Sequence, residues 1–124
     1  MPDPSLSSET VSAEDGKLVT LARSARLRAY ADAGLAEGAA VRDTDGRTYA
    51  AATVANADEA LSTSALRGAV VAAVSSGART FEAAAVVTEG LPSEADLAVL
   101  REFGVGVPVL LAGPDGAVRE TLST

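Results

Sequence analysis

The side chains that could carry chemistry in this chain are hydroxyls and carboxylates, because it contains no cysteine and no histidine. Ser64 and Ser93 each precede an apolar stretch with helical spacing, and Asp96 follows Ser93 by three residues. A serine nucleophile needs a neighbouring base, and the only lysine that could serve is Lys17. A hydrolase that uses two carboxylates stays open, although no spacing in the sequence selects a pair.

These three side chains also have a structural interpretation. Serine is favoured at a helix N-cap, where its oxygen accepts a hydrogen bond from a backbone N–H group. Ser93-Glu94-Ala95-Asp96 has the form of a capping box, which Asp96 would close while complementing the helix dipole. The alternatives are a polar pocket lined by both serines and a metal ion bound by Asp96. The sequence favours capping for all three.

The first half of the chain predicts one helix and a hairpin. Ser12-Ala13-Glu14-Asp15 resembles a capping box, and apolar residues at helical spacing extend a helix to about Ala31. Short apolar runs at 39–42 and 48–54 flank Asp45-Gly46, which suits a tight turn because glycine accepts a positive φ. We expect a hairpin there, although Asp43-Thr44-Asp45-Gly46 also resembles the opening of a calcium loop whose later ligands are missing.

The second half predicts two helices and three strands. One helix begins at residues 62–64 and stops at Gly77, and another begins at Ser93 and stops at Gly104. Gly68 lies inside the first of these and indicates close packing against another element or subunit. Strands are expected at 83–87, 107–112 and 118–122.

The resulting order, α-β-β-α-β-α-β-β, predicts one mixed sheet of five strands with helices on its faces. Residues 1–12 are polar and proline-containing and are expected to form a disordered leader. Residues 13–124 then form a single domain. The basic residues of the first helix form either a solvated face, which the sequence favours, or a contact for an acidic partner: Lys17, Arg23, Arg26 and Arg28.

Composition excludes several classes of partner. The formal net charge is −7, which argues against non-specific nucleic-acid binding and against anionic membranes. No apolar run is long enough to span a bilayer. The start, Met1-Pro2-Asp3-Pro4, lacks the basic and apolar regions of a signal peptide. We therefore expect a cytoplasmic protein.

Two segments at a fixed spacing resemble a known family. Thr53-Val54-Ala55-Asn56-Ala57, followed by Ser64-Ala65-Leu66-Arg67, resembles the short, free-standing cytidine deaminases, which read N-V-E-N-A and then C-A-E-R. Pro92-Ser93-Glu94-Ala95-Asp96 stands where that family has P-C-x-x-C. Further matches extend the resemblance over roughly residues 17–122: Gly38-Ala39-Ala40-Val41, Asp45-Gly46, Val99-Leu100, Glu102-Phe103, Val107-Pro108-Val109 and Asp115-Gly116. The resemblance implies a three-layer α/β/α fold.

The departures from the family pattern fall on its chemistry. A zinc deaminase needs three zinc ligands to generate hydroxide and a glutamate to move protons. The resemblance places the ligand positions at Ser64, Ser93 and Asp96 and the glutamate at Leu66. Neutral hydroxyls are weak zinc ligands and leucine carries no proton, so we expect no cofactor and no deamination. Leu66 is instead expected to fill the core.

The substrate-binding positions differ as well. By the same resemblance, the ribose-binding Asn and Glu correspond to Thr53 and Ala55, and a phenylalanine of the family corresponds to Leu35. Arg67 matches an arginine that neighbours the zinc thiolates. An unpaired buried arginine is costly, so we expect Arg67 to pair with Asp96 or to turn to solvent.

Three functions follow as hypotheses. The first is a non-catalytic binding or assembly module, and the resemblance implies a homodimer or homotetramer. The second is a small-molecule site for a nucleoside, nucleotide or anion in the remnant pocket, formed by Leu35, Thr53, Ala55, Ser64, Leu66, Arg67, Ser93 and Asp96, because converging helix N-termini favour anions. The third is a hydrolase of this family that uses non-standard residues.

Overall fold

The computed structural model describes residues 11–124, so residues 1–10 of the expected leader lie outside the described residues. Every predicted helix and strand is present, in the predicted order, together with two short 3-10 helices. The elements are α2 (Ala13–Arg26), η1 (Ala33–Leu35), β1 (Gly38–Asp43), β2 (Thr48–Ala52), η2 (Glu59–Leu61), α3 (Ala65–Ser75), β3 (Phe81–Val87), α4 (Glu94–Arg101), β4 (Pro108–Ala112) and β5 (Val118–Ser123).

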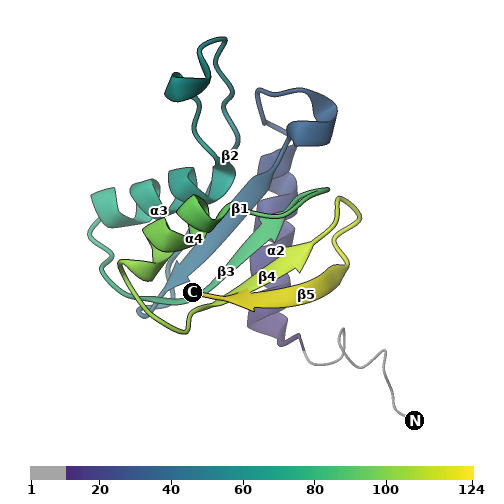
Figure 1. The fold of residues 1–124 in the computed structure, drawn as a ribbon. Helices are drawn as coiled ribbons and strands as arrows, with labels where there is room; N and C mark the ends of the chain where they lie inside the picture. Colours follow the sequence, from purple (N-terminus) through teal and green to yellow (C-terminus); the bar gives the residue numbers. More distant parts are fainter. Residues whose placement is uncertain (1–10) are drawn as a thin grey trace.

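The five strands form one mixed sheet, which confirms the predicted fold class. The strand order is β2-β1-β3-β4-β5, with β3 and β4 parallel and every other pair antiparallel. Helix α2 covers one face, and α3 and α4 cover the other (Figure 1). Helix α4 follows β3 and leads to β4, so its N-terminus lies at the end of the sheet where β3 ends. The N-terminus of α3 lies at the same end (Figure 1).

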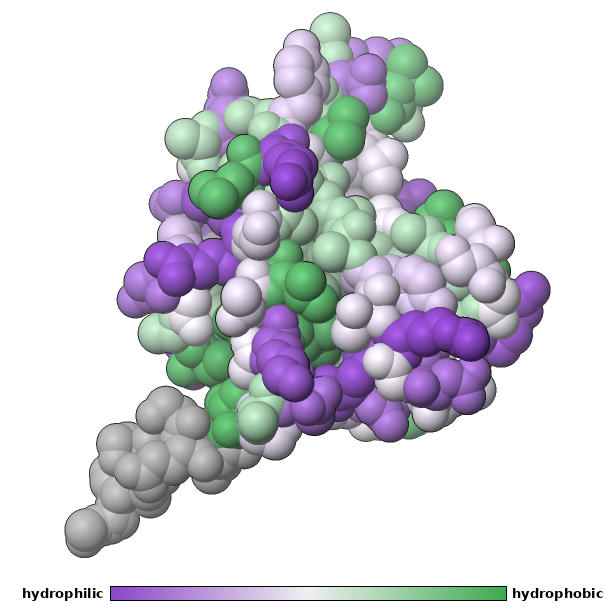
Figure 2. Space-filling model, turned by 180° about the vertical axis from the view of Figure 1, so that it is seen from behind, coloured by the Kyte–Doolittle hydropathy of each residue, from purple (hydrophilic) through white to green (hydrophobic). Residues whose placement is uncertain are grey.

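Small apolar side chains fill the space on both sides of the sheet. Along β3, Ala84 and Val86 pack with α3 and α4, whereas Ala83, Ala85 and Val87 pack with α2. A strand covered on both faces reads as a continuous apolar run, which is why the sequence pattern identified β3. Viewed from the α2 side, hydrophobic residues reach the surface in a short strip that hydrophilic residues border (Figure 2).

The predicted hairpin is confirmed, and the carboxylate of Asp43 stabilises its turn. Gly46 has a φ of 88°. Oδ1 of Asp43 accepts hydrogen bonds from the N–H groups of Asp45 (3.0 Å) and Arg47 (2.9 Å), and Oδ2 accepts one from the Tyr49 hydroxyl (3.2 Å). The hydrogen bonds of Asp43 therefore support the turn interpretation over the calcium loop.

The first helix ends five residues before the predicted Ala31, because the following backbone pairs elsewhere. The Tyr30 N–H donates to the Thr53 carbonyl at 2.9 Å, and the Tyr30 carbonyl accepts from the Ala55 N–H at 2.7 Å. These tertiary hydrogen bonds replace the helical ones that local spacing suggested. The expected basic face is also partly structural, since Arg23 and Arg26 donate to the carbonyls of Pro114 and Ala36.

Gly68 explains how α3 approaches the sheet edge. A Cβ at this position would lie 3.0 Å from the Cβ of Ala51 in β2. The close packing that the sequence indicated is therefore with another element of the same chain. Within residues 11–124, no helix is long and apolar enough to cross a membrane.

Candidate functional site at the start of two helices

Ser64 and Ser93 are both N-caps, as the sequence favoured. Each has an extended backbone conformation, with φ and ψ of −75° and 158° for Ser64 and −76° and 162° for Ser93. Oγ of Ser64 accepts from the Arg67 N–H at 3.3 Å, and Oγ of Ser93 accepts from the Asp96 N–H at 3.1 Å. Both hydroxyl oxygens thus satisfy backbone donors that a helix start leaves without partners.

Asp96 links the two helix starts. Its side chain is buried, and its Oδ1 accepts a hydrogen bond of 2.8 Å from the Ser64 hydroxyl. The sequence prediction that Asp96 closes the Ser93 capping box is therefore wrong, because the carboxylate is directed across to α3. Ser64, Ser93 and Asp96, which are separated by up to 32 residues, form one hydrogen-bonded cluster.

Leu66 lies in the core beneath this cluster. Only 1% of its surface is exposed, and it belongs to the apolar cluster that contains Val70 and Leu100. The expected role of Leu66 as a core residue is confirmed. Arg67 is exposed to solvent, which is one of the two outcomes expected for it, and within residues 11–124 it forms no ion pair with Asp96.

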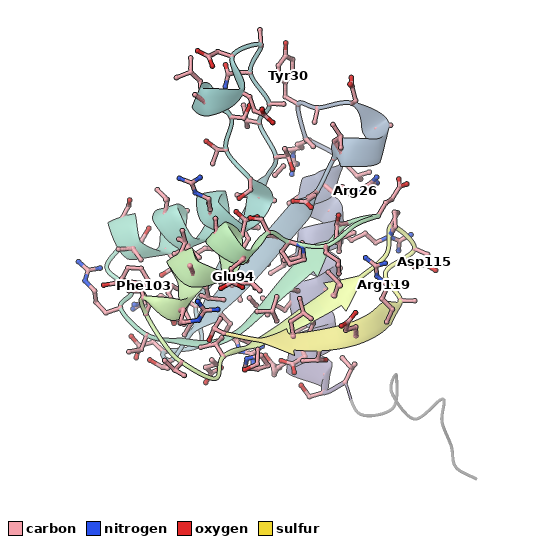
Figure 3. All side chains as sticks on the ribbon, viewed as in Figure 1. Arg26, Tyr30, Glu94, Phe103, Asp115 and Arg119 are labelled. Atoms are coloured by element: carbon pink, nitrogen blue, oxygen red, sulfur yellow. The ribbon has the colours of Figure 1, made fainter. Side chains whose placement is uncertain are left out.

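The other predicted pocket residues lie in two loops next to the helix starts. Thr53 accepts a hydrogen bond from the Glu37 N–H through its hydroxyl (3.0 Å), and the backbone of Ala55 pairs with Tyr30. Leu35 is 70% exposed in η1. Tyr30 projects from the same end of the molecule (Figure 3). The structure thus brings three of the predicted site residues into direct contact and leaves Leu35 on the surface.

Glu37 is a site residue that the sequence analysis missed. Its carboxylate is half-buried and accepts a 2.9 Å hydrogen bond from the Thr88 hydroxyl. Burial raises the pKa of the Glu37 carboxyl, the Thr88 hydrogen bond acts in the opposite direction, and the negative charge of Asp96 adds to the increase. Its only sequence signal is an acidic residue directly before the apolar run that forms β1.

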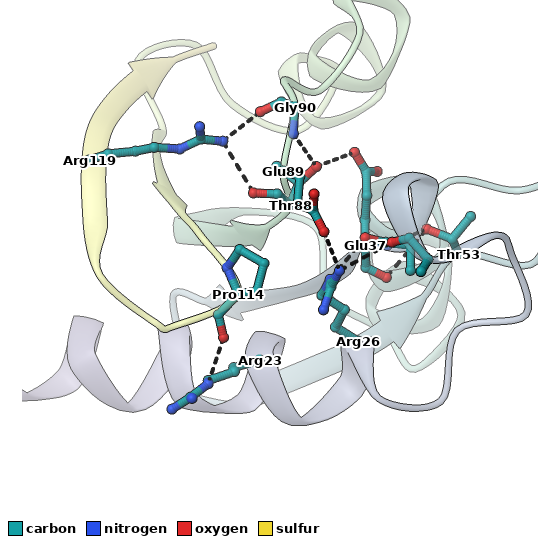
Figure 4. A network of polar contacts seen from close by, with 11 residues as sticks. Arg23, Arg26, Glu37, Thr53, Thr88, Glu89, Gly90, Pro114 and Arg119 are labelled. Carbon is teal, nitrogen blue, oxygen red and sulfur yellow. Dashed lines mark hydrogen bonds and ion pairs between the residues drawn. The ribbon is translucent and has the colours of Figure 1, made fainter.

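Two arginines hold the segment between β3 and α4 (Figure 4). Nη2 of Arg119 donates to the carbonyls of Thr88 (3.2 Å) and Gly90 (2.6 Å), and Nη2 of Arg26 pairs with Glu89 at 3.2 Å. Oγ1 of Thr88 also accepts from the Gly90 N–H at 3.0 Å. These contacts from β5 and α2 fix the segment that leads to Ser93.

The donor atoms of the cluster do not suit zinc. Zinc sites in proteins use thiolates, imidazoles and carboxylates, whereas two of the three side chains here are neutral hydroxyls. The Ser64 hydroxyl proton is donated to Asp96, which leaves the single carboxylate engaged with a partner. This arrangement can stabilise two helix ends, but it offers weak ligands to a metal and no proton carrier at Leu66.

Comparison with known proteins places this α/β fold among the cytidine deaminases. The family model described as cytidine deaminase-like matches residues 11–116. A cytidine deaminase of Sporosarcina psychrophila is 37% identical over 111 residues, which are 85% of this chain and 82% of that protein. The chain therefore belongs to the cytidine deaminase-like family.

Solved structures agree with this assignment. The cytidine deaminase of Burkholderia pseudomallei is 35% identical, with a TM-score of 0.77 over 86% of this chain and 90% of that chain. The cytidine deaminase of Mycobacterium tuberculosis is 28% identical, with a TM-score of 0.72 over 84% and 88% of the two chains. Both structural similarities cover more than four fifths of this chain.

Proposed function

We propose that this chain is a non-catalytic protein with the cytidine-deaminase fold, acting as a homo-oligomeric binding or assembly module without zinc or deaminase activity. The observation that carries the proposal is the Ser64–Asp96 hydrogen bond above the buried Leu66. By the resemblance, these residues stand at two ligand positions and at the proton-carrying position. Two of these side chains hydrogen-bond to each other and the third packs in the core, so all three stabilise the fold.

The chemistry of deamination supports the same proposal. Attack on the pyrimidine requires a metal-activated hydroxide and a group that delivers a proton to the leaving ammonia. A deaminase uses three strong zinc ligands, whereas the corresponding positions here provide two hydroxyls and one carboxylate, from Ser64, Ser93 and Asp96. Leu66 provides no acidic group. The substrate-binding positions, Thr53 and Ala55, are also changed. Several required groups are therefore replaced at once.

Ammonia release tests this proposal against the hydrolase alternative. The purified chain is incubated with cytidine and deoxycytidine, with and without added zinc, beside the cytidine deaminase of Sporosarcina psychrophila as the active control. We expect no ammonia above the rate without protein. Turnover that depends on the chain would contradict the proposal and support a hydrolase with non-standard residues.

The second candidate function is small-molecule binding at the helix starts. The convergence of the α3 and α4 N-termini favours it, because helix N-termini attract anions. The carboxylates of Asp96 and Glu37 oppose it for anionic ligands, since like charges repel at short range. A thermal-shift screen with nucleosides, nucleotides and simple anions separates the candidates, and the assembly proposal expects no ligand to raise the melting temperature.

A further inference from the structure

The first helix borders a cavity on the face of the sheet that α3 and α4 do not cover. The cavity has a volume of about 270 Å³ and lies between α2 and the turn that joins β4 to β5. Three valines from separate parts of the chain form its apolar wall, namely Val11, Val19 and Val118. Because α3 and α4 lie on the other face of the sheet (Figure 1), this cavity is separate from the site at their N-termini.

Arg23 brings a positive charge without a counter-charge to this cavity. Its Nε donates to the Pro114 carbonyl at 2.9 Å, and both Nη groups point away from that hydrogen bond (Figure 4). Within residues 11–124, Arg23 forms no ion pair and donates no other hydrogen bond. A Cβ at Gly116 would lie 3.4 Å from the Arg23 Cδ, so the backbone of the turn packs against this side chain. The guanidinium is therefore held in place before a ligand binds, which lowers the cost of binding.

The carboxylate that lines the same cavity, that of Asp115, is engaged by its own turn. Its Oδ1 accepts a hydrogen bond from the Ala117 N–H at 2.9 Å, and in the described part of the chain it forms no ion pair with Arg23. The polar group of the cavity that still lacks a partner is thus the planar fork of Arg23. This fork matches the geometry of a carboxylate, which it can bind through two parallel hydrogen bonds.

We propose that this cavity binds a small aliphatic carboxylate, with the carboxylate on Arg23 and the hydrocarbon chain against the three valines. The inference goes beyond the proposed function and depends on neither assembly nor the absence of deamination. A volume of about 270 Å³ is small for a ligand pocket, so it suits a short chain. A simple anion such as acetate has too little hydrocarbon to bury, and it should bind only weakly.

Titration of the purified chain with acetate, butanoate and hexanoate tests the proposal by nuclear magnetic resonance. Each added CH₂ group should strengthen binding about fourfold, because it buries apolar surface against the valines. Hexanol and hexylamine have the same chain without the carboxylate, and they should bind about tenfold more weakly than hexanoate or worse. The backbone amide signals of Thr20 and Gly116 should shift as hexanoate binds. Equal binding of hexanol, an affinity that does not depend on chain length, or shifts confined to other parts of the chain would overturn the proposal.

Two variants test the charge and the cavity separately. Arg23→Gln should raise the dissociation constant for hexanoate about tenfold or more, whereas Arg28→Gln, at an exposed position after α2, should leave it unchanged. Gly16→Leu should fill the cavity and keep the fold, because a Cβ at Gly16 meets no atom within 4 Å and leucine favours a helix more than glycine does. A folded Gly16→Leu variant that binds hexanoate as well as the unmodified chain would overturn the proposal, as would full affinity in Arg23→Gln.

Discussion

Glu37 is the residue whose environment most clearly opposes its charge. Burial and the nearby Asp96 raise the pKa of its carboxyl above the ordinary value, against the effect of the Thr88 hydrogen bond. The folded state therefore binds this proton more tightly than the unfolded state. The contribution of Glu37 to stability is fully present at pH values below its unfolded pKa and is lost as the pH rises through the folded pKa.

Glu37→Gln should stabilise the protein at pH 8 by about 0.5 kcal/mol, a small value because solvent screens a half-buried charge. Glutamine keeps an oxygen for the Thr88 hydroxyl and removes the repulsion from Asp96. The advantage should shrink as the pH falls toward 4, where glutamate itself is neutral. Urea unfolding at several pH values measures the difference, with exposed Glu120→Gln as the control. A stabilisation that does not vary with pH would contradict this account.

Leu66 tests whether the position that the resemblance assigns to a proton-carrying glutamate serves the core in this chain. Leu66→Ala removes three carbon atoms from a site that is 1% exposed and should reduce the free energy of unfolding by about 3 kcal/mol. Leu91→Ala, at a position that is 65% exposed, should change it by less than about 0.5 kcal/mol. Denaturant titrations of both variants provide the measurement. Equal small losses would mean that Leu66 packs loosely against its neighbours.

At the scale of elements, the packing of α2 on the sheet depends on Gly38. A Cβ at this position would overlap the backbone of Ala22 and Arg26, with the Arg26 Cα only 2.9 Å away. Backbone atoms in a packed helix cannot move aside without displacing the whole helix, so the absence of a side chain sets how closely α2 approaches β1.

Gly38→Ala should therefore cost about 2 kcal/mol or more, because overpacking forces α2 away from the sheet. Gly34→Ala is the matched control, since a Cβ there meets no atom within 4 Å. Thermal unfolding of the two variants measures the effect. A normal melting temperature for Gly38→Ala would show that α2 can shift at little cost.

The sequence predicted best those elements whose signals are local. The caps at Ser12, Ser64 and Ser93 and the turn at Gly46 require particular residue types, so the starts of the helices and the hairpin could be identified. The end of α2 could not be predicted, because the residues after Arg26 have helical spacing and are held outside the helix by pairing with the segment at Thr53–Ala55.

The candidate site shows the same difference between features set by local sequence and features set by tertiary contacts. The spacing that this chain shares with a known family located Ser64, Ser93 and Asp96. The preference of serine for helix N-caps gave the correct role for both serines. The direction of the Asp96 side chain and the involvement of Glu37 depend on which loops meet in three dimensions. Neither follows from local pattern, since Glu37 contacts Thr88, a residue 51 positions further along the chain.

At the scale of the whole molecule, the sheet and helices bring together the three positions that the resemblance assigns to zinc ligands, although none of them is a cysteine or a histidine. The 2.8 Å contact between Ser64 and Asp96 and the 3.1 Å capping bond of Ser93 show that the three positions still converge. If the scaffold alone determines this geometry, replacing the donor atoms with thiolates should create a metal site.

The variant with Ser64→Cys, Ser93→Cys and Asp96→Cys should therefore bind about one zinc ion per chain, because three thiolates and a water form a normal tetrahedral site. Metal analysis after dialysis measures the zinc, and zinc should raise the melting temperature, since binding to the folded state adds to stability. In the control, Ser62→Cys replaces Ser64→Cys, so one thiol lies outside the cluster and zinc binding should be much weaker. Equal binding by both variants would mean that any three nearby thiols suffice, and a folded triple variant without zinc would show that the positions no longer converge closely enough for a metal.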